Sequence, residues 1–261
     1  MTDAAPPDDA VRYETAAGVA TVTLNQPDAR NVLNATTLPL LLDALQRAAV
    51  DDTVRVVVLT GTGSAFCAGA DLREAQLGTG FAGDAPRMLV GVLEALLDHP
   101  KPTIARVQGH VAGGGNGLVA ACDLAVAAEG ARFAFSEVRV GVAPAVISVV
   151  CLQVMSPRDA AELMLTGERV PAERALRAGL LTAVVEADAL DATVGSLAEQ
   201  LQQGGPSALA ATKQLLRTVP TLDRDRAFAW TAELSGSLFG SAEAAEGMRA
   251  FVERRPPSWQ L

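Results

Sequence analysis

Aromatic residues, cysteine, histidine and lysine are all scarce in this chain of 261 residues. Aromatics make up only 4% of it, so the 49% of residues that are hydrophobic are mainly Val, Leu and Ala. Three cysteines without close spacing argue against a disulfide framework or a zinc site, and two histidines are too few for a typical metal cluster. These scarcities point away from metal-binding and disulfide-stapled proteins, and we expect no metal site.

Positive charge is in deficit as well. The formal net charge is −9, and only two of the 21 basic residues are lysines. Proteins that bind nucleic acid normally present a basic face, so we expect no nucleic-acid partner. A small anionic ligand, held by a few arginines and backbone N–H groups, remains compatible with this composition.

Long apolar runs are absent, so the sequence predicts no membrane span. Residues 1–10 are acidic and rich in Pro and Ala, and they lack the apolar segment of a signal peptide. We therefore expect residues 1–10 to form a disordered tail on a cytoplasmic protein.

The sequence does contain an alternation of strand and helix signals. Runs rich in β-branched residues separate segments with helical spacing, which predicts an α/β body over residues 11–189. After residue 190 the strand signals stop, and helical patterns predict an all-helical region over residues 190–261. The strands are expected at 19–24, 55–60, 103–107 and 124–128, and the body helices at 36–50, 86–97 and 114–121.

Two loops rich in Gly and Ala each follow a predicted strand and precede a predicted helix. They are residues 66–72 (Phe-Cys-Ala-Gly-Ala-Asp-Leu) and residues 113–117 (Gly-Gly-Gly-Asn-Gly). Small side chains let another molecule approach the backbone and leave N–H groups free to point at it. Two such loops can supply two donors to one oxygen, which is an oxyanion hole. Close packing of a helix against a strand is the alternative explanation of the glycine cluster.

Seven segments follow one another along the chain in a characteristic order: residues 25–34, 66–72, 113–117, 121–127, 135–137, 212–216 and 251–255. Together they resemble the crotonase superfamily, the enoyl-CoA hydratase/isomerase family. The resemblance implies a spiral of strand-strand-helix units, with a C-terminal helical region that drives assembly into a trimer or a dimer of trimers. It also implies an acyl-CoA thioester as substrate and no separate cofactor, because coenzyme A is part of that substrate.

The resemblance also assigns roles to individual residues. It implies that the backbone N–H groups of Ala68 and Gly114 are the oxyanion donors. It places coenzyme A against the early motif and the first loop, with Arg30 available to the pyrophosphate. The residues expected to contact coenzyme A are Arg30, Val32, Ala68, Ala70, Asp71 and Leu72.

Glu137 is the candidate acid–base group, because it stands in an apolar stretch where a charge is costly unless it is used or paired. Burial would raise its pKa toward a range useful for proton transfer. The alternative is a salt bridge to Arg132 or Arg139. By the resemblance, Glu137 matches the second of the two catalytic glutamates of enoyl-CoA hydratases.

The chain departs from the two-glutamate hydratases at Gly117, where the resemblance would place the first glutamate. We expect a reversible enoyl-CoA hydratase that works with a single glutamate. The alternatives are a Δ3,Δ2-enoyl-CoA isomerase, which needs only one shuttling carboxylate, and a non-catalytic acyl-CoA-binding paralogue. By the resemblance, the common hydratases have a glycine-richer segment where this chain has Ala145, Val146 and Ile147. We expect these bulkier residues to reshape the acyl pocket. A positive φ at Gly117 is the expected obstacle to restoring a glutamate there.

Overall fold

The computed structural model describes residues 9–260 of the chain. Its larger sheet has six strands in the order β1-β2-β3-β5-β7-β10. Strand β1 pairs antiparallel with β2, and every other pairing in this sheet is parallel. The strands are β1 (Val11–Ala16), β2 (Val19–Leu24), β3 (Val56–Gly61), β5 (Thr103–Val107), β7 (Leu124–Ala128) and β10 (Ala183–Val185).

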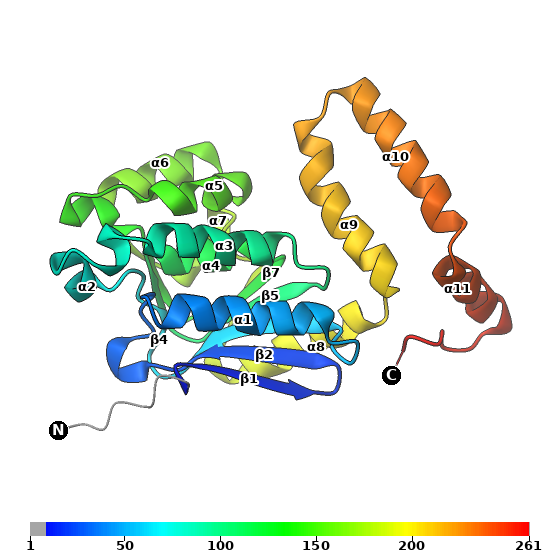
Figure 1. The fold of residues 1–261 in the computed structure, drawn as a ribbon, viewed down its shortest axis with the longest axis horizontal. Helices are drawn as coiled ribbons and strands as arrows, with labels where there is room; N and C mark the ends of the chain where they lie inside the picture. The colour runs from blue at the N-terminus through cyan, green and yellow to red at the C-terminus, as the bar shows by residue number, and fades with distance from the viewer. Residues whose placement is uncertain (1–8, 261) are drawn as a thin grey trace.

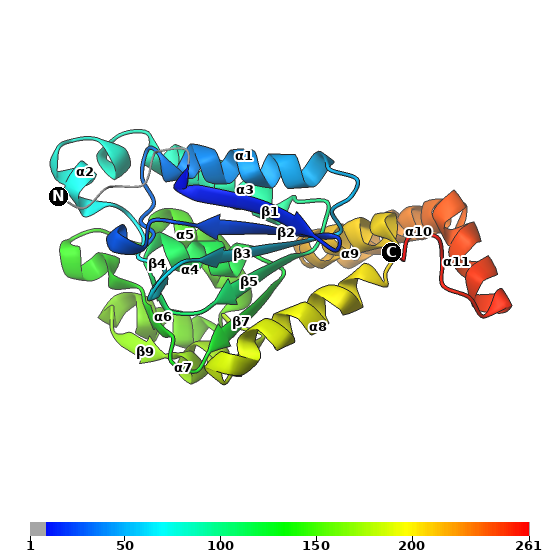
Figure 2. The same ribbon diagram turned by 90° about the horizontal axis from the view of Figure 1, so that it is seen from below.

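A smaller sheet has four strands in the order β4-β6-β8-β9. Each of β3, β5 and β7 is followed along the chain by one of β4, β6 and β8, and then by helical structure. The first strand of each unit joins the larger sheet and the second joins the smaller one, which confirms the expected spiral of strand-strand-helix units (Figure 2). The strands are β4 (Ala65–Cys67), β6 (His110–Ala112), β8 (Arg132–Ala134) and β9 (Arg169–Pro171).

Two apolar layers cover the larger sheet. Every residue of β3 is buried, because alternate side chains serve opposite faces: Val57 and Leu59 join the main core, whereas Val56 and Val58 join a second cluster. The main core packs against α1 and α3, and the second cluster packs against α8. The helices are α1 (Thr37–Val50), α2 (Leu72–Gln76), α3 (Ala85–Leu97), α4 (Gly114–Ala121), α5 (Ala145–Val154), α6 (Pro157–Thr166), α7 (Ala172–Arg177), α8 (Leu190–Gln202), α9 (Pro206–Thr218), α10 (Arg224–Phe239) and α11 (Ala242–Glu253).

Helix α8, with which the expected helical region begins, packs against the body. Its apolar residues Leu190, Val194 and Ala198 recur at helical spacing and are buried against the sheet. Only α9, α10 and α11 extend away from the body as a helical tail (Figure 1). On this tail Phe228, Phe239, Phe251 and Val252 are exposed.

Polar contacts tie the tail to the body. Lys213 of α9 is buried, and its Nζ donates to Asp123 Oδ2 at 2.5 Å and to the Lys101 carbonyl at 3.1 Å. The buried guanidinium of Arg55 donates to the carbonyls of Gly204 and Trp259 at 2.8 and 2.6 Å. These hydrogen bonds fix the direction in which the tail leaves the body.

Part of the expected N-terminal tail lies in the fold. Residues 1–8 are outside the described residues, but Ala10 is buried and its carbonyl accepts a hydrogen bond from the Asn25 N–H at 2.8 Å. Asp9 forms an ion pair with Arg12 at 2.9 Å. Between residues 9 and 260, no helix is both long enough and apolar enough to cross a membrane.

Candidate functional site

The two glycine-rich loops meet in space. A Cβ placed on Gly69 would lie 3.2 Å from the Gly114 nitrogen and 2.8 Å from the Ala112 carbonyl oxygen. Gly69 also has a φ of +82°, and Gly113 has a φ of +50°. Both positions favour glycine because of their positive φ, and at Gly69 a side chain would also push the two loops apart.

The hydrogen bonds of the loops decide which N–H groups are free. The Ala68 N–H donates to the Arg30 carbonyl at 3.0 Å, so it is already engaged, and the expectation that Ala68 is a donor does not fit this geometry. The Ala70 and Gly114 N–H groups have no acceptor among residues 9–260. Gly114 opens helix α4, so the helix dipole adds positive charge at its nitrogen.

The Glu137 carboxyl group lies beside this meeting point. It comes from η4 (Ser136–Val140), a 3₁₀ helix that follows strand β8. A Cβ placed on Gly113 would lie 3.5 Å from Glu137 Oε1 and 3.6 Å from the Gly69 Cα. The site therefore gathers the first loop, the second loop and the carboxyl group around Gly113.

The Glu137 carboxyl group has no ion-pair partner in the described part of the chain. Arg132 donates to carbonyls of its own turn, and Arg139 donates to the Thr166 carbonyl, so neither forms the alternative salt bridge. Oε2 of Glu137 is buried without a hydrogen-bond partner. Burial raises the pKa of the Glu137 carboxyl above its ordinary value.

The segments expected to hold coenzyme A lie side by side. The Leu33 N–H donates to the Gly69 carbonyl at 2.7 Å, and the Asp71 N–H donates to the Leu33 carbonyl at 3.1 Å. These bonds bring Arg30 and Val32 next to Ala68 and Ala70. The Arg30 side chain is exposed.

Asp71 and Leu72 also stand at this edge, where α2 begins. The Asp71 carboxylate caps α2 by accepting a hydrogen bond from the Arg73 N–H at 2.9 Å. Leu72 is exposed. The structure thus collects all the residues expected to contact coenzyme A along one edge of the site.

Gly117 faces a side chain rather than open space. A Cβ at Gly117 would lie 2.5 Å from Cγ2 of Ile147 and 3.6 Å from Cδ2 of Leu93. The φ of Gly117 is not positive, so the expected conformational obstacle is wrong and the constraint is steric. The bulky residue at position 147 therefore fills the space that a carboxylate at position 117 would need.

The structure also draws attention to Asn116, which the sequence analysis did not single out. Every residue of α4 is buried, and Asn116 is its only polar side chain. An asparagine inside an otherwise apolar helix was the available signal.

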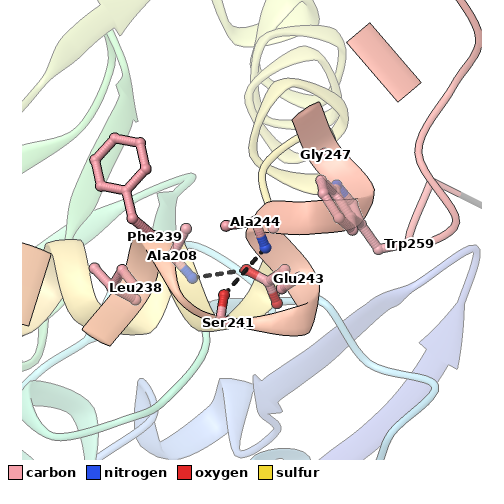
Figure 3. A pocket seen from close by; sticks show the side chains of 9 residues that line it. Ala208, Leu238, Phe239, Ser241, Glu243, Ala244, Gly247 and Trp259 are labelled. Carbon is pink, nitrogen blue, oxygen red and sulfur yellow. Dashed lines mark hydrogen bonds between the residues drawn. The ribbon is translucent and has the colours of Figure 1, made fainter. Parts of the chain in front are cut away.

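A cavity of about 200 Å³ lies elsewhere, between α9, α11 and the end of α10 (Figure 3). Its carboxylate, Glu243, accepts hydrogen bonds from the N–H groups of Ser207 and Ala208 at 3.0 and 2.9 Å and so caps α9. Phe239 and Trp259 line the cavity. None of the residues that gather around Gly113 lines it.

This chain is similar over most of its length to a family of known proteins. The family model described as enoyl-CoA hydratase/isomerase matches residues 14–261. A Thermus thermophilus protein provisionally named an enoyl-CoA hydratase is 37% identical over 243 residues, which cover 92% of this chain and 96% of the relative. The (E)-benzylidenesuccinyl-CoA hydratase of Thauera aromatica is 34% identical, with 96% and 98% of the two chains covered. The crystal structure of an enoyl-CoA hydratase from Mycobacterium smegmatis has a TM-score of 0.90 at 34% identity, with 97% and 99% covered.

Proposed function

The chain belongs to the enoyl-CoA hydratase/isomerase family, and we propose that it catalyses the reversible addition of water to a 2-enoyl-CoA thioester. The observation that carries this proposal is the unpaired Glu137 carboxyl group beside Gly113, where two loops present free N–H groups. A half-buried carboxylate with one oxygen buried and unpaired is costly, and a protein that only bound acyl-CoA would have no use for it. This disfavours the non-catalytic alternative.

In the proposed reaction, the thioester carbonyl oxygen accepts hydrogen bonds from the N–H groups of Ala70 and Gly114. When hydroxide adds to C3, the electrons of the C2–C3 double bond move toward this oxygen and form an enolate. Preorganised donors stabilise that charge, and removing one such donor typically costs about 3–4 kcal/mol. The engaged N–H of Ala68 is left to hold the first loop against Arg30.

Glu137 serves as both base and acid in turn. Its carboxylate takes a proton from water as the hydroxide bonds to C3, and the resulting carboxylic acid returns that proton to C2. The net change is the addition of one water molecule, and Glu137 ends as it began. A pKa raised by burial makes Glu137 a stronger base than an ordinary glutamate.

A Δ3,Δ2-enoyl-CoA isomerase is the second candidate, and the contact between Gly117 and Ile147 favours it. Because Ile147 fills the space of a second carboxylate, the site has room for one proton carrier. In isomerisation Glu137 would take a proton from C2 and return it to C4, with the same enolate held by the same donors. Only substrate turnover distinguishes the two reactions.

Coenzyme A would lie along the paired segments that contain Arg30, Val32, Ala70 and Leu72. Backbone groups, rather than a cluster of basic side chains, would supply most of its contacts. The exposed Phe228, Phe239 and Phe251 of the tail support a trimer or a dimer of trimers, because monomers seldom expose so many large apolar side chains.

A spectrophotometric assay with crotonyl-CoA and 3-hexenoyl-CoA tests the proposal. For a hydratase, we expect the absorbance of the conjugated enoyl thioester to fall as crotonyl-CoA is hydrated. For an isomerase, we expect the same absorbance to rise as 3-hexenoyl-CoA becomes the conjugated 2-enoyl thioester. No turnover of either substrate, together with equal affinity for butyrate and butyryl-CoA by calorimetry, would refute both. Light scattering on the same sample gives the oligomeric state, and a monomer at micromolar concentration would refute the trimer.

A further inference from the structure

The Asn116 side chain joins the second loop to the end of strand β8. Its Nδ2 donates to the Ala134 carbonyl at 2.9 Å and to the Gly113 carbonyl at 3.3 Å. Both partners are acceptors, so the orientation of the amide is determined by this network. Oδ1 of Asn116 is left buried without a hydrogen-bond partner in the described part of the chain.

Each of the two carbonyls already accepts a backbone hydrogen bond without the Asn116 side chain. The Ala134 carbonyl also accepts a hydrogen bond from the Gly113 N–H at 3.1 Å, and the Gly113 carbonyl accepts one from the Asn116 N–H at 2.9 Å. The side chain therefore adds second donors to groups already paired, while its own oxygen is desolvated. Leaving an acceptor buried without a partner is itself destabilising, so the amide adds little that stability requires.

The amide does connect the two halves of the site. Gly113 precedes Gly114, whose N–H is a proposed oxyanion donor, and Ala134 ends the strand from which η4 and Glu137 follow. The Asn116 side chain therefore hydrogen-bonds both to the loop that holds the donor and to the strand that leads to the carboxyl group.

We propose that Asn116 is a positioning residue, which fixes the Gly114 N–H relative to Glu137 by clamping the Gly113 and Ala134 carbonyls together. The inference rests on the proposed function. Misplacement of reacting groups by about 1 Å can cost about 100-fold in rate, so loosening this clamp should lower turnover without removing any group that touches the substrate.

The test compares Asn116→Leu and Asn116→Ala with the wild-type protein. Leu removes the donor while filling the space, and Ala gives a smaller side chain in case Leu does not pack. We expect kcat with crotonyl-CoA to fall about 10- to 100-fold, with KM little changed and with the melting temperature of the Leu variant retained. Val119→Ala is the matched control in the same helix, and it should lower the melting temperature while kcat is retained.

A second readout measures the oxyanion donors themselves. Polarisation by two N–H groups should lower the infrared C=O stretching frequency of a bound, isotope-labelled acyl-CoA thioester. We expect this shift to shrink in the Asn116 variants and to persist in Glu137→Gln. If whichever Asn116 variant folds keeps the wild-type kcat and the wild-type shift, the positioning role is overturned. If the wild-type protein itself shows no shift, the proposed oxyanion site fails instead.

Discussion

Ile147 of α5 lies against Gly117 of α4 so closely that a Cβ on Gly117 would be 2.5 Å from its Cγ2. Both residues are buried, and helix α4 has no exposed side. The absence of a carboxylate at position 117 is therefore matched by added volume at position 147. A larger residue at position 117 therefore requires a smaller one at position 147.

This relationship predicts that Gly117→Glu alone destabilises the protein severely, because a tightly packed core resists added volume. Gly117→Glu combined with Ile147→Gly should recover much of the lost stability. Thermal unfolding of both variants, with Ile147→Gly as control, measures the recovery. If the second carboxylate then takes part in hydration, the double variant should exceed Ile147→Gly in crotonyl-CoA turnover by at least about 10-fold. A double variant that folds no better than Gly117→Glu would contradict the steric explanation.

Glu137→Gln keeps the shape of the side chain but removes its transferable proton. We expect kcat to fall roughly 100- to 10,000-fold, the usual cost of losing a general acid–base group. Affinity for butyryl-CoA should change little, because in the proposed complex backbone groups hold the thioester and the nucleotide. Glu137→Asp is the control that retains a carboxylate but withdraws it, and an intermediate rate is expected. Wild-type turnover by Glu137→Gln would defeat the single-glutamate mechanism.

The same substitution should change how stability depends on pH. Because burial raises the Glu137 pKa above 4.5, the native state binds the proton more tightly than the unfolded state. The stability that this group contributes is fully present below pH 4.5 and is lost as pH rises through the native pKa. Glu137→Gln should therefore be more stable than wild type at pH 7, and this difference should shrink toward pH 4.

Urea unfolding between pH 4 and pH 8 measures this difference. Glu199→Gln on α8 is the control, because it makes the same substitution at an exposed side chain away from the site. A wild-type protein that equals Glu137→Gln in stability at pH 7 would contradict a raised pKa for Glu137 in the native state.

The anchor of α9 gives a prediction about the tail. Lys213→Met leaves the partly exposed Asp123 carboxylate without its closest cation, and losing a hydrogen bond to a charged group typically costs about 1.5–3 kcal/mol. Thr103 still donates to Asp123 and Arg217 lies 3.8 Å from it, so we expect a loss of about 2 kcal/mol in the free energy of unfolding. Arg224→Met removes an exposed pair with Asp225 and should cost less than about 1 kcal/mol. Equal losses in the two variants would argue against a structural anchor.

The sequence predicted those strands and helices that depend mainly on local residue patterns. The parallel strands near 19–24, 103–107 and 124–128 were predicted, because buried β-branched runs are distinctive in sequence. The short strands of the smaller sheet were not, because three residues are too few to show a period. Helix α8 was predicted as a helix, but its place against Val56 and Val58 depends on tertiary packing.

The candidate site shows the same division. The order of the motifs predicted Glu137 and Gly114 as site residues, and in the structure both lie beside Gly113. The choice between the N–H groups of Ala68 and Ala70 depends on where the Arg30 carbonyl lies, which no local pattern reveals. The contact between Gly117 and Ile147 likewise joins two helices that are distant in sequence.

The burial of the three cysteines makes them probes of local opening. Burial raises the thiol pKa of Cys67 and Cys122 to about 12 and raises that of Cys151 as well, so alkylating reagents should react only when a segment opens. Cys67 adjoins the first loop, and Cys122 follows helix α4. Cys151 lies on α5, about one helical turn after Ile147. Timed labelling followed by mass spectrometry would therefore show which wall of the site opens first, in a protein that needs no introduced label.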